Sequence, residues 1–284
     1  MVVRIVTDST ADLPAEVAQE LGIAVVPLRV FFGDDAYLDG IELDNAGFYE
    51  KLAAYKDLPT TSQPAPAAFQ EVYQRLIDEG AEAILSIHLS SKLSGTYQAA
   101  CTGRDSLSEN AHHIPFAIID SQSISIGMSY VILNAARMAR EGKSLQELQA
   151  HVEETLARTS ILAVLDTLEY VRRGGRIGAA SALLGNMLSF KPIISLKDGE
   201  VVPLERPRTR GKAYARLAQL LSEKGEIEYV AIAESNDEVG QQLSEAIKSV
   251  YTRDVPIYKL GAALGTHTGP GTAAISIVTA IGKA

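Results

Sequence analysis

In the first half of the chain, short β-rich runs alternate with amphipathic stretches, and this alternation restricts the fold more than any other feature. Such an order is typical of a parallel sheet flanked by helices. We expect strands at 2–6, 83–89 and 116–120, which end at polar segments around Asp8, Ser90 and Asp120. Because the carboxyl ends of parallel strands meet at one edge of a sheet, a ligand crevice is expected there.

The second half has a different pattern. Strand-like runs at 192–196 and 201–204 flank Asp198-Gly199, a pair that favours the turn of an antiparallel hairpin. At 284 residues the chain exceeds the usual size of one domain, about 100–200 residues. We therefore predict an α/β chain of two domains: an N-terminal α/β domain over 1–159, with a largely parallel sheet between helices, and a C-terminal α+β domain over 160–284, with a mixed sheet.

The other expected elements follow from the same patterns. Helices are expected at 14–21, 46–55, 66–79, from 95, 126–140, 145–158, 212–224 and 238–251, an extended run at 23–32, and strands at 161–165, 229–233, 257–260 and 273–280.

Composition excludes several classes of function. The 26 basic and 35 acidic side chains give a net charge of −9, which opposes attraction to nucleic acid and to anionic lipid surfaces. Cys101 is the only cysteine, so the chain can form neither an intrachain disulfide nor a thiolate metal cluster, and no histidine pair has metal-ligand spacing. No apolar stretch is long enough for a membrane span or a signal peptide, and we expect a cytoplasmic protein without a metal or cofactor.

The octapeptide Ser90–Tyr97, Ser-Ser-Lys-Leu-Ser-Gly-Thr-Tyr, follows the predicted strand at 83–89. Hydroxyls and backbone amides at the start of a helix suit a carboxylate or a phosphate group. One interpretation places an anion on Ser94 and the amides of Gly95 and Thr96. The other makes Ser91 or Ser94 the N-cap of the next helix, and the two interpretations are compatible.

Further polar clusters allow the same two interpretations, ligand contact or helix capping. They are Thr7–Thr10 with Asp12, Thr60–Pro64 with Thr61 and Ser62, Asp120–Ser123, and Gly265–Gly271 with His267. We expect His267 in a turn and the other four histidines at scattered or surface positions. A single histidine is more often structural or solvated than a ligand-binding residue.

Two basic clusters stand out on this acidic chain. They are Arg172, Arg173 and Arg176, and Arg206, Arg208, Arg210, Lys212 and Arg216. Arginine side chains match the geometry of phosphate and carboxylate groups, so either cluster could dock an acidic or phosphate-bearing partner. The alternative is a solvated turn and a solvated helix face.

Taken in order, a set of motifs resembles the DegV family of bacterial fatty acid-binding proteins. The motifs are Thr7-Asp8-Ser9, Asp12-Leu13-Pro14, Thr61-Ser62-Gln63-Pro64, the octapeptide, Asp120-Ser121, Gly174-Gly175-Arg176-Ile177, Lys191-Pro192-Ile193 and His267-Thr268-Gly269-Pro270-Gly271. The resemblance implies a protein, not itself an enzyme, that holds one long-chain fatty acid in a tunnel between two domains. A separate ATP-dependent kinase would phosphorylate the bound acid to an acyl phosphate, which feeds phospholipid synthesis.

The resemblance also implies which residues bind the acid. Thr61, Ser94 and His267 would hold its carboxyl group, and we add Ser62, Gly95 and Thr96 from the same segments. Ala65 stands where the family pattern has a serine. For docking the kinase we expect Arg172, Arg173 and Arg176, or Arg208 and Arg210. The resemblance leaves room for a transient membrane contact, which the net charge does not favour.

Candidate lining for the tunnel comes from a run of small and flexible apolar residues that could equally be ordinary core. The run comprises Ala179, Ala180, Ala182, Leu183, Leu184, Met187, Leu188 and Phe190.

Two other classes of function use the same residues. A serine hydrolase or acyltransferase would have Ser94 as nucleophile and His267 as base, but the chain has neither a Gly-x-Ser-x-Gly motif nor an obvious orienting carboxylate. A phosphate-binding regulator would combine the hydroxyls with the arginine clusters, but no phosphate-binding glycine loop is present.

Overall fold

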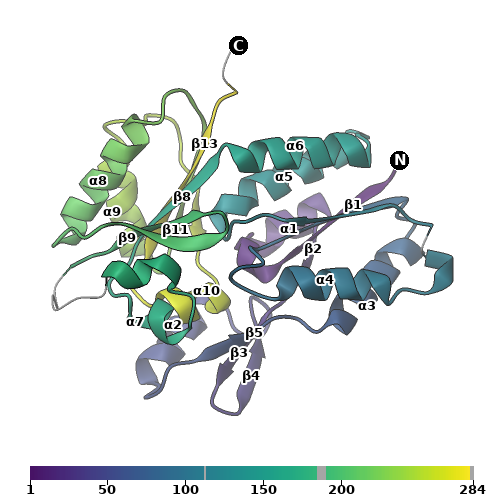
Figure 1. Cartoon of the computed structure of the whole chain (residues 1–284), viewed down its shortest axis with the longest axis horizontal. Helices are drawn as coiled ribbons and strands as arrows, with labels where there is room; N and C mark the ends of the chain where they lie inside the picture. The colour runs from purple at the N-terminus through teal and green to yellow at the C-terminus, as the bar shows by residue number, and fades with distance from the viewer. Residues whose placement is uncertain (112, 184–189, 282–284) are drawn as a thin grey trace.

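A computed structural model describes residues 1–111, 113–183 and 190–281 of the chain (Figure 1). Its first sheet comprises β2 (Ala24–Val26), β1 (Val3–Asp8), β6 (Ala83–His88) and β7 (Phe116–Asp120), in that order. All neighbouring pairs are parallel, and His88 lies opposite Asp120. The predicted parallel sheet is confirmed, and its strands bring the polar segments after Asp8, His88 and Asp120 to one edge.

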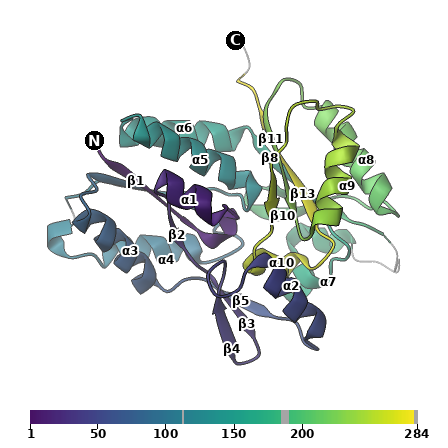
Figure 2. The ribbon, with the colours of Figure 1, turned by 180° about the vertical axis from the view of Figure 1, so that it is seen from behind.

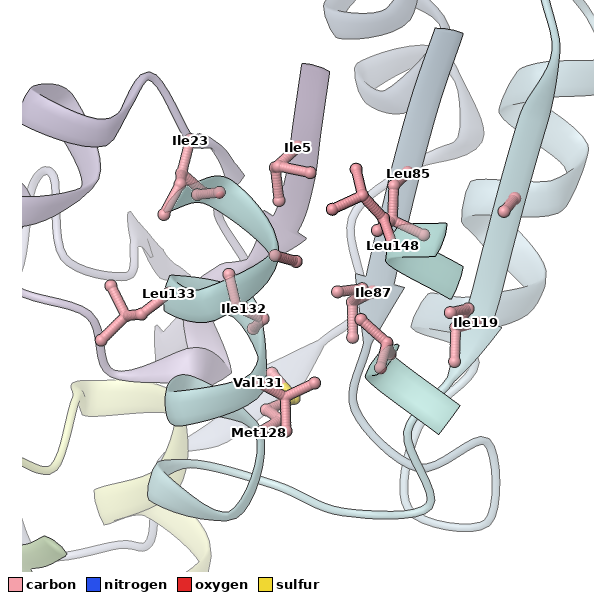
Figure 3. Close-up of a cluster of buried hydrophobic side chains, with 14 of the residues drawn as sticks. Ile5, Ile23, Leu85, Ile87, Ile119, Met128, Val131, Ile132, Leu133 and Leu148 are labelled. Carbon is pink, nitrogen blue, oxygen red and sulfur yellow. The ribbon is translucent and has the colours of Figure 1, made fainter. Parts of the chain in front are cut away.

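Helices cover both faces of this sheet. They are α1 (Ala15–Leu21), α3 (Pro66–Asp78), α4 (Thr96–Asp105), α5 (Ile126–Arg140) and α6 (Leu145–Ala157). On one face, Ile5, Leu85 and Ile87 of the strands pack against Met128 and Leu148 of α5 and α6 (Figure 3). The other face packs against α3 and α4. Burial on both faces explains why every residue of β6 is buried.

A second, six-stranded sheet follows along the chain. Its order is β10 (Glu200–Glu205), β9 (Ile193–Lys197), β8 (Thr159–Val164), β13 (Ala273–Thr279), β11 (Ile227–Glu234) and β12 (Ile257–Lys259). Only the β11–β12 pair is parallel, so the predicted mixed sheet is confirmed. The predicted hairpin turns at Asp198 and Gly199, both with positive φ. β8 begins at the predicted boundary, and the division at 159/160 stays a prediction.

Helices α8 (Arg210–Ser222) and α9 (Asp237–Ile247) pack on one face of this sheet (Figure 2). Leu162, Val164 and Ile193 point towards them, and because side chains alternate along a strand, Ile161, Ala163 and Ile194 face the other way. That second face is left for α5 and for the site described below.

The predicted extended run at 23–32 is divided between two sheets. β2 ends before Pro27, and β3 (Arg29–Phe32) joins β4 (Asp35–Leu38) and β5 (Thr60–Ser62) in a separate antiparallel sheet. Proline has no backbone N–H group for a ladder, which explains the break. This small sheet packs against α2 (Asn45–Ala54) and α10 (Ala262–Thr268).

His267 therefore lies in the last turn of α10 and not in a loop turn, which corrects the expectation for that segment. The remaining short helices are α7 (Glu169–Arg173) and the 3₁₀ turns η1 (Ser9–Ala11), η2 (Glu109–Ala111) and η3 (Gly178–Leu183).

Candidate functional site: an apolar cavity with a polar end

A cavity of about 270 Å³ lies against the face of the six-stranded sheet that carries Ile161, Ala163 and Ile194 and is turned away from α8 and α9. This volume is close to the lower end of the range of about 300–1,000 Å³ for small-molecule sites. Its apolar lining comprises Leu28, Leu89, Leu93, Ile124, Ile161, Ala163, Val171, Ile194, Leu196, Val201, Leu260, Ala263, Leu264 and Ala274. The lining thus comes from both halves of the chain, and its largely apolar character suits an apolar ligand.

The lining also includes polar side chains, among them Thr10, Ser125, Ser195, Thr268 and Thr272 and a further set that contains predicted site residues. Thr61 and Ser62 come from β5, Ser94 from the octapeptide and His267 from α10. Thr61 Oγ1 and His267 Nε2 are 2.7 Å apart, within hydrogen-bond distance. The structure therefore brings together four of the predicted site residues from three distant segments; their contact with a ligand stays a prediction.

The imidazole ring of His267 is buried, and its surroundings indicate which nitrogen carries the proton. Its Nδ1 atom is buried and has no hydrogen-bond partner among the described residues. A Cβ atom on Gly174 would lie only 2.3 Å from that Nδ1, so the absence of a side chain there makes room for the ring. A buried N–H group without an acceptor is rare, which favours a neutral ring with its proton on Nε2. In that tautomer the ring donates to Thr61, and the Thr61 hydroxyl can donate to a ligand.

Burial, with a smaller contribution from Arg176, lowers the pKa of His267 from 6.5 to about 4. We expect NMR titration to find this ring neutral at pH 6, with assignment from the His267→Gln variant. Because the unfolded histidine is protonated first, its contribution to folding stability falls as the pH drops from about 6.5 to about 4. A measured pKa close to 6.5 would contradict this environment.

The hydroxyls of the octapeptide have separate roles. Ser90 Oγ donates to Gly199 O at 2.7 Å and so fastens the β9–β10 hairpin to the first sheet. Ser94 Oγ lies 2.9 Å from Thr96 Oγ1 and accepts from Thr96 N at 3.3 Å. Ser94 therefore lines the cavity and accepts from the first amide of α4. The N-cap of α4 is Gly95, so the expectation that Ser91 or Ser94 is the N-cap is wrong, and anion binding at this segment stays a prediction.

Gly95 and Thr96 do not line the cavity. Thr96 is fully buried, and the Gln63 side chain lies over Gly95, where a Cβ atom would be 2.7 Å from the amide. Gln63 itself lines the cavity, a position that the sequence analysis did not single out.

The arginines of the two basic clusters differ in their contacts. Arg176 lines the cavity and donates through Nε to Leu93 O at 3.1 Å. Arg172 and Arg173 are exposed and both pair with Glu169. Arg208 is also exposed.

Arg210 is only partly exposed because it pairs with Asp166, at 2.5 Å, beside Lys191. Arg176 is exposed like Arg172, Arg173 and Arg208, and of these four it alone also lines the cavity.

The apolar run predicted as tunnel lining is not confirmed for its described members. Ala179 and Ala182 are exposed, while Ala180, Leu183 and Phe190 pack in a core cluster with Leu165. Leu184, Met187 and Leu188 lie outside the described residues. Part of the apolar lining comes instead from β8, β9, β10 and β13, and strands that are apolar on both faces do not reveal from sequence which face meets a cavity.

His88 is fully buried, so its predicted surface position is wrong. His88 Nδ1 lies 2.9 Å from Asp8 Oδ2, and its Nε2 lies 2.7 Å from Ser86 Oγ, which reaches Tyr73 OH at 2.8 Å. All four side chains are fully buried between the first sheet and α3, which carries Tyr73, and the network satisfies polar groups that would otherwise be costly to bury.

The hydrolase alternative requires a direct bond between Ser94 and His267. In the ranges that the structure describes, His267 instead bonds Thr61, and Ser94 bonds Thr96. Within those same ranges, no cluster of histidine, cysteine and acidic residues could hold a metal ion. None of the described helices has both the length and the apolar character to cross a membrane.

Comparisons with known proteins agree with this architecture. A family model described as an uncharacterised protein family, DegV, matches residues 2–280. A DegV domain-containing protein of Halalkalibacterium halodurans is 41% identical over 279 residues, 96% of this chain and 97% of the relative.

Two solved structures are similar along nearly the whole chain. A Thermus thermophilus structure described as fatty acid binding of a DegV family protein has a TM-score of 0.88 and 32% identity, and covers 99% of this chain and 100% of its own. Bacillus subtilis DegV, described as a fatty acid binding protein, has a TM-score of 0.87, 32% identity and the same coverage.

Proposed function

The chain belongs to the DegV family, and we propose that it binds one long-chain fatty acid in the cavity and presents the carboxyl group to an ATP-dependent fatty acid kinase. The kinase would convert the bound acid to an acyl phosphate for phospholipid synthesis. The chain itself would act as the substrate-presenting subunit.

The observation that carries this proposal is a cavity whose lining is largely apolar and also contains the Thr61–His267 pair, Ser94 and Arg176. Burying about 15 methylene groups at about 0.8 kcal/mol each gives on the order of 12 kcal/mol before ordering costs. The alkyl chain therefore supplies enough free energy for binding, and the polar side chains need only orient the carboxyl group. The similar structures described as fatty acid-binding support this assignment.

The proposed orientation places the carboxylate at Thr61, Ser94 and His267 and the alkyl chain along Ile161 and Ile194. The guanidinium of Arg176 lines the same cavity and favours an anionic head group there. Since the lining comes from both 1–159 and 160–284, we also propose that the cavity is a tunnel between two domains.

Removing the hydroxyls at Thr61 and Ser94 should separate presentation from binding. We expect the Thr61→Ala/Ser94→Ala variant to bind hexadecanoic acid no more than about 30-fold more weakly, because each net hydrogen bond contributes about 1 kcal/mol. Acyl-phosphate formation with the kinase should fall about 1,000-fold, since a misplaced reacting group loses about a further 100-fold.

Ser91→Ala is the matched control, because the exposed Ser91 hydroxyl bonds Asp120. It should leave both quantities unchanged. Equal losses of binding and phosphorylation in the double variant would contradict the proposal that the alkyl chain supplies the affinity and the hydroxyls orient the carboxyl group.

Charge reversal at the exposed arginines should weaken recognition by the kinase and leave the affinity for the fatty acid unchanged. We expect Arg172→Glu/Arg173→Glu to raise the kinase KM for the loaded protein at least about 10-fold, because it reverses charge at the proposed docking surface. The hexadecanoic acid Kd should stay the same. Lys248→Glu is a suitable control, since Lys248 is also exposed and likewise pairs with a glutamate, Glu245. Unchanged kinase kinetics would show that Arg172 and Arg173 do not form the docking site. The Arg208→Glu variant tests the second basic cluster in the same way.

A further inference from the structure

Two buried carboxylates meet the N-terminus of α10, the short helix that carries His267. Asp12 Oδ1 accepts from Gly261 N at 2.8 Å, and Asp39 Oδ1 accepts from Ala263 N at 3.2 Å. Only 8% of Asp12 and 3% of Asp39 is exposed. Both aspartates come from the first half of the chain, so these bonds join segments more than 200 residues apart.

The second oxygen of each carboxylate is fixed as well. Ser125 Oγ donates to Asp12 Oδ2, and Ser9 Oγ donates to Asp39 Oδ2 at 2.7 Å. Ser9 Oγ in turn accepts from Leu28 N at 3.0 Å. Because Ser125, Leu28 and Ala263 all line the cavity, the two carboxylates lie directly behind its wall.

α10 depends on these contacts for its first turn. It is seven residues long, and its N-cap Gly261 has no side chain to satisfy the first amides. A Cβ atom at Gly261 would lie 3.0 Å from Asp12 Oδ1 and 3.1 Å from Asp39 Oδ1, so the carboxylates occupy the cap position. A helix this short is marginal without tertiary contacts.

Burying two acids close together is costly. Burial raises the pKa of Asp39 to about 6 and that of Asp12 above its usual range. The positive end of the helix dipole offsets part of that cost. The two buried aspartates contact the start of α10 directly, so they can fix the position of the whole helix. His267 lies at the other end of that helix.

His267 is six residues beyond Gly261, about 9 Å along the axis. Its bond to Thr61 is 2.7 Å long, and a small tilt of α10 would break it.

We propose that Asp12 and Asp39 are positioning residues of the fatty-acid site: by binding the first amides of α10, they set where His267 meets Thr61 and hence where the carboxyl group is held. This inference rests on the proposed function.

The experiment compares hexadecanoic acid with hexadecanol, which has the same chain and no carboxyl group. We expect Asp39→Ala to weaken binding of the acid about 10-fold and binding of the alcohol less than about 2-fold. Ala263 and Leu264 of α10 line the cavity for the alkyl chain of either ligand, whereas His267 at the end of the helix is proposed to hold only the carboxyl group. Asp39→Asn keeps an acceptor for Ala263 N and should recover most of the acid affinity. The same series at Asp12 should behave alike.

A second readout reports on His267 itself. In Asp39→Ala and Asp12→Ala, its pKa measured by NMR should rise from about 4 towards 6.5 as the ring leaves its buried position. Glu228→Ala is the control, because that partly buried carboxylate pairs with Tyr130 and Arg158 at a distance from α10. In this variant, the pKa of His267 and the ratio of the affinities for the acid and the alcohol should match those of the wild type.

The outcomes separate the two proposals. If the wild type binds neither ligand, the proposed function fails, while the pKa of His267 still tests the positioning role. If the wild type binds the acid but the aspartate variants lose acid and alcohol equally, or keep both with an unchanged His267, the positioning role is overturned.

Discussion

Replacing Ala163 by phenylalanine is expected to lower the affinity for hexadecanoic acid at least about 100-fold while the protein stays folded. Ala163 lies on β8 in the cavity wall, paired with Ile194 on β9 and Ala274 on β13. A phenyl ring there would take the space of about four methylene groups of the proposed ligand, a loss of about 3 kcal/mol. Filling a cavity usually stabilises an unliganded protein, so the melting temperature of the free form should not fall.

Isothermal titration calorimetry and thermal melting together check this result. Ala215→Phe adds the same side chain at an exposed position of α8 and should change neither the affinity nor the fold. If the Ala163 variant melts like the wild type and still binds the acid with full affinity, the alkyl chain does not occupy this cavity.

Adding one methyl group at Gly174 should reduce acyl-phosphate formation about 100-fold, the scale expected when a reacting group is misplaced by about 1 Å. The new Cβ would lie 2.3 Å from His267 Nδ1, so the ring must move away from Thr61. Gly174 has φ −67°, a conformation open to alanine, so backbone strain would not cause the loss. Gly→Ala at such a site is otherwise stabilising by about 0.4–1 kcal/mol.

Gly211→Ala is the matched control, since no atom lies within 4 Å of the added carbon. The kinase assay, together with the NMR shifts of His267, would show whether the ring has moved. Full phosphorylation by the Gly174→Ala variant, with an unchanged His267 signal, would mean that the position of this ring does not matter for presentation.

The strands that end at Asp8, His88 and Asp120 could be predicted because their signal is local: a short apolar run followed by polar turn residues. α10 could not be predicted in the same way. Its seven residues include Gly265, and Gly269-Pro270-Gly271 follows, so the local signal favours a turn. The acids that cap it lie more than 200 residues earlier in the chain, where no local pattern connects them to it.

The same limit applies to the site. Thr61, Ser94 and His267 could be proposed together from the resemblance, and the structure brings them to one cavity. The run at 179–190 is not confirmed as lining for its described members, whereas β8 and β9 do line the cavity. These strands are apolar on both faces, so the sequence does not distinguish core from lining. The burial of His88 is likewise not evident from the sequence, because its partner Asp8 is 80 residues away.

The central claim is that one long-chain fatty acid occupies the cavity. Mass spectrometry of the native protein purified from cells, followed by extraction and analysis of its lipids, tests this most directly. We predict a complex that carries one fatty acid per chain, which is lost in the Ala163→Phe variant and retained in Ala215→Phe. A wild-type protein that carries no fatty acid and binds no added hexadecanoic acid would contradict the claim.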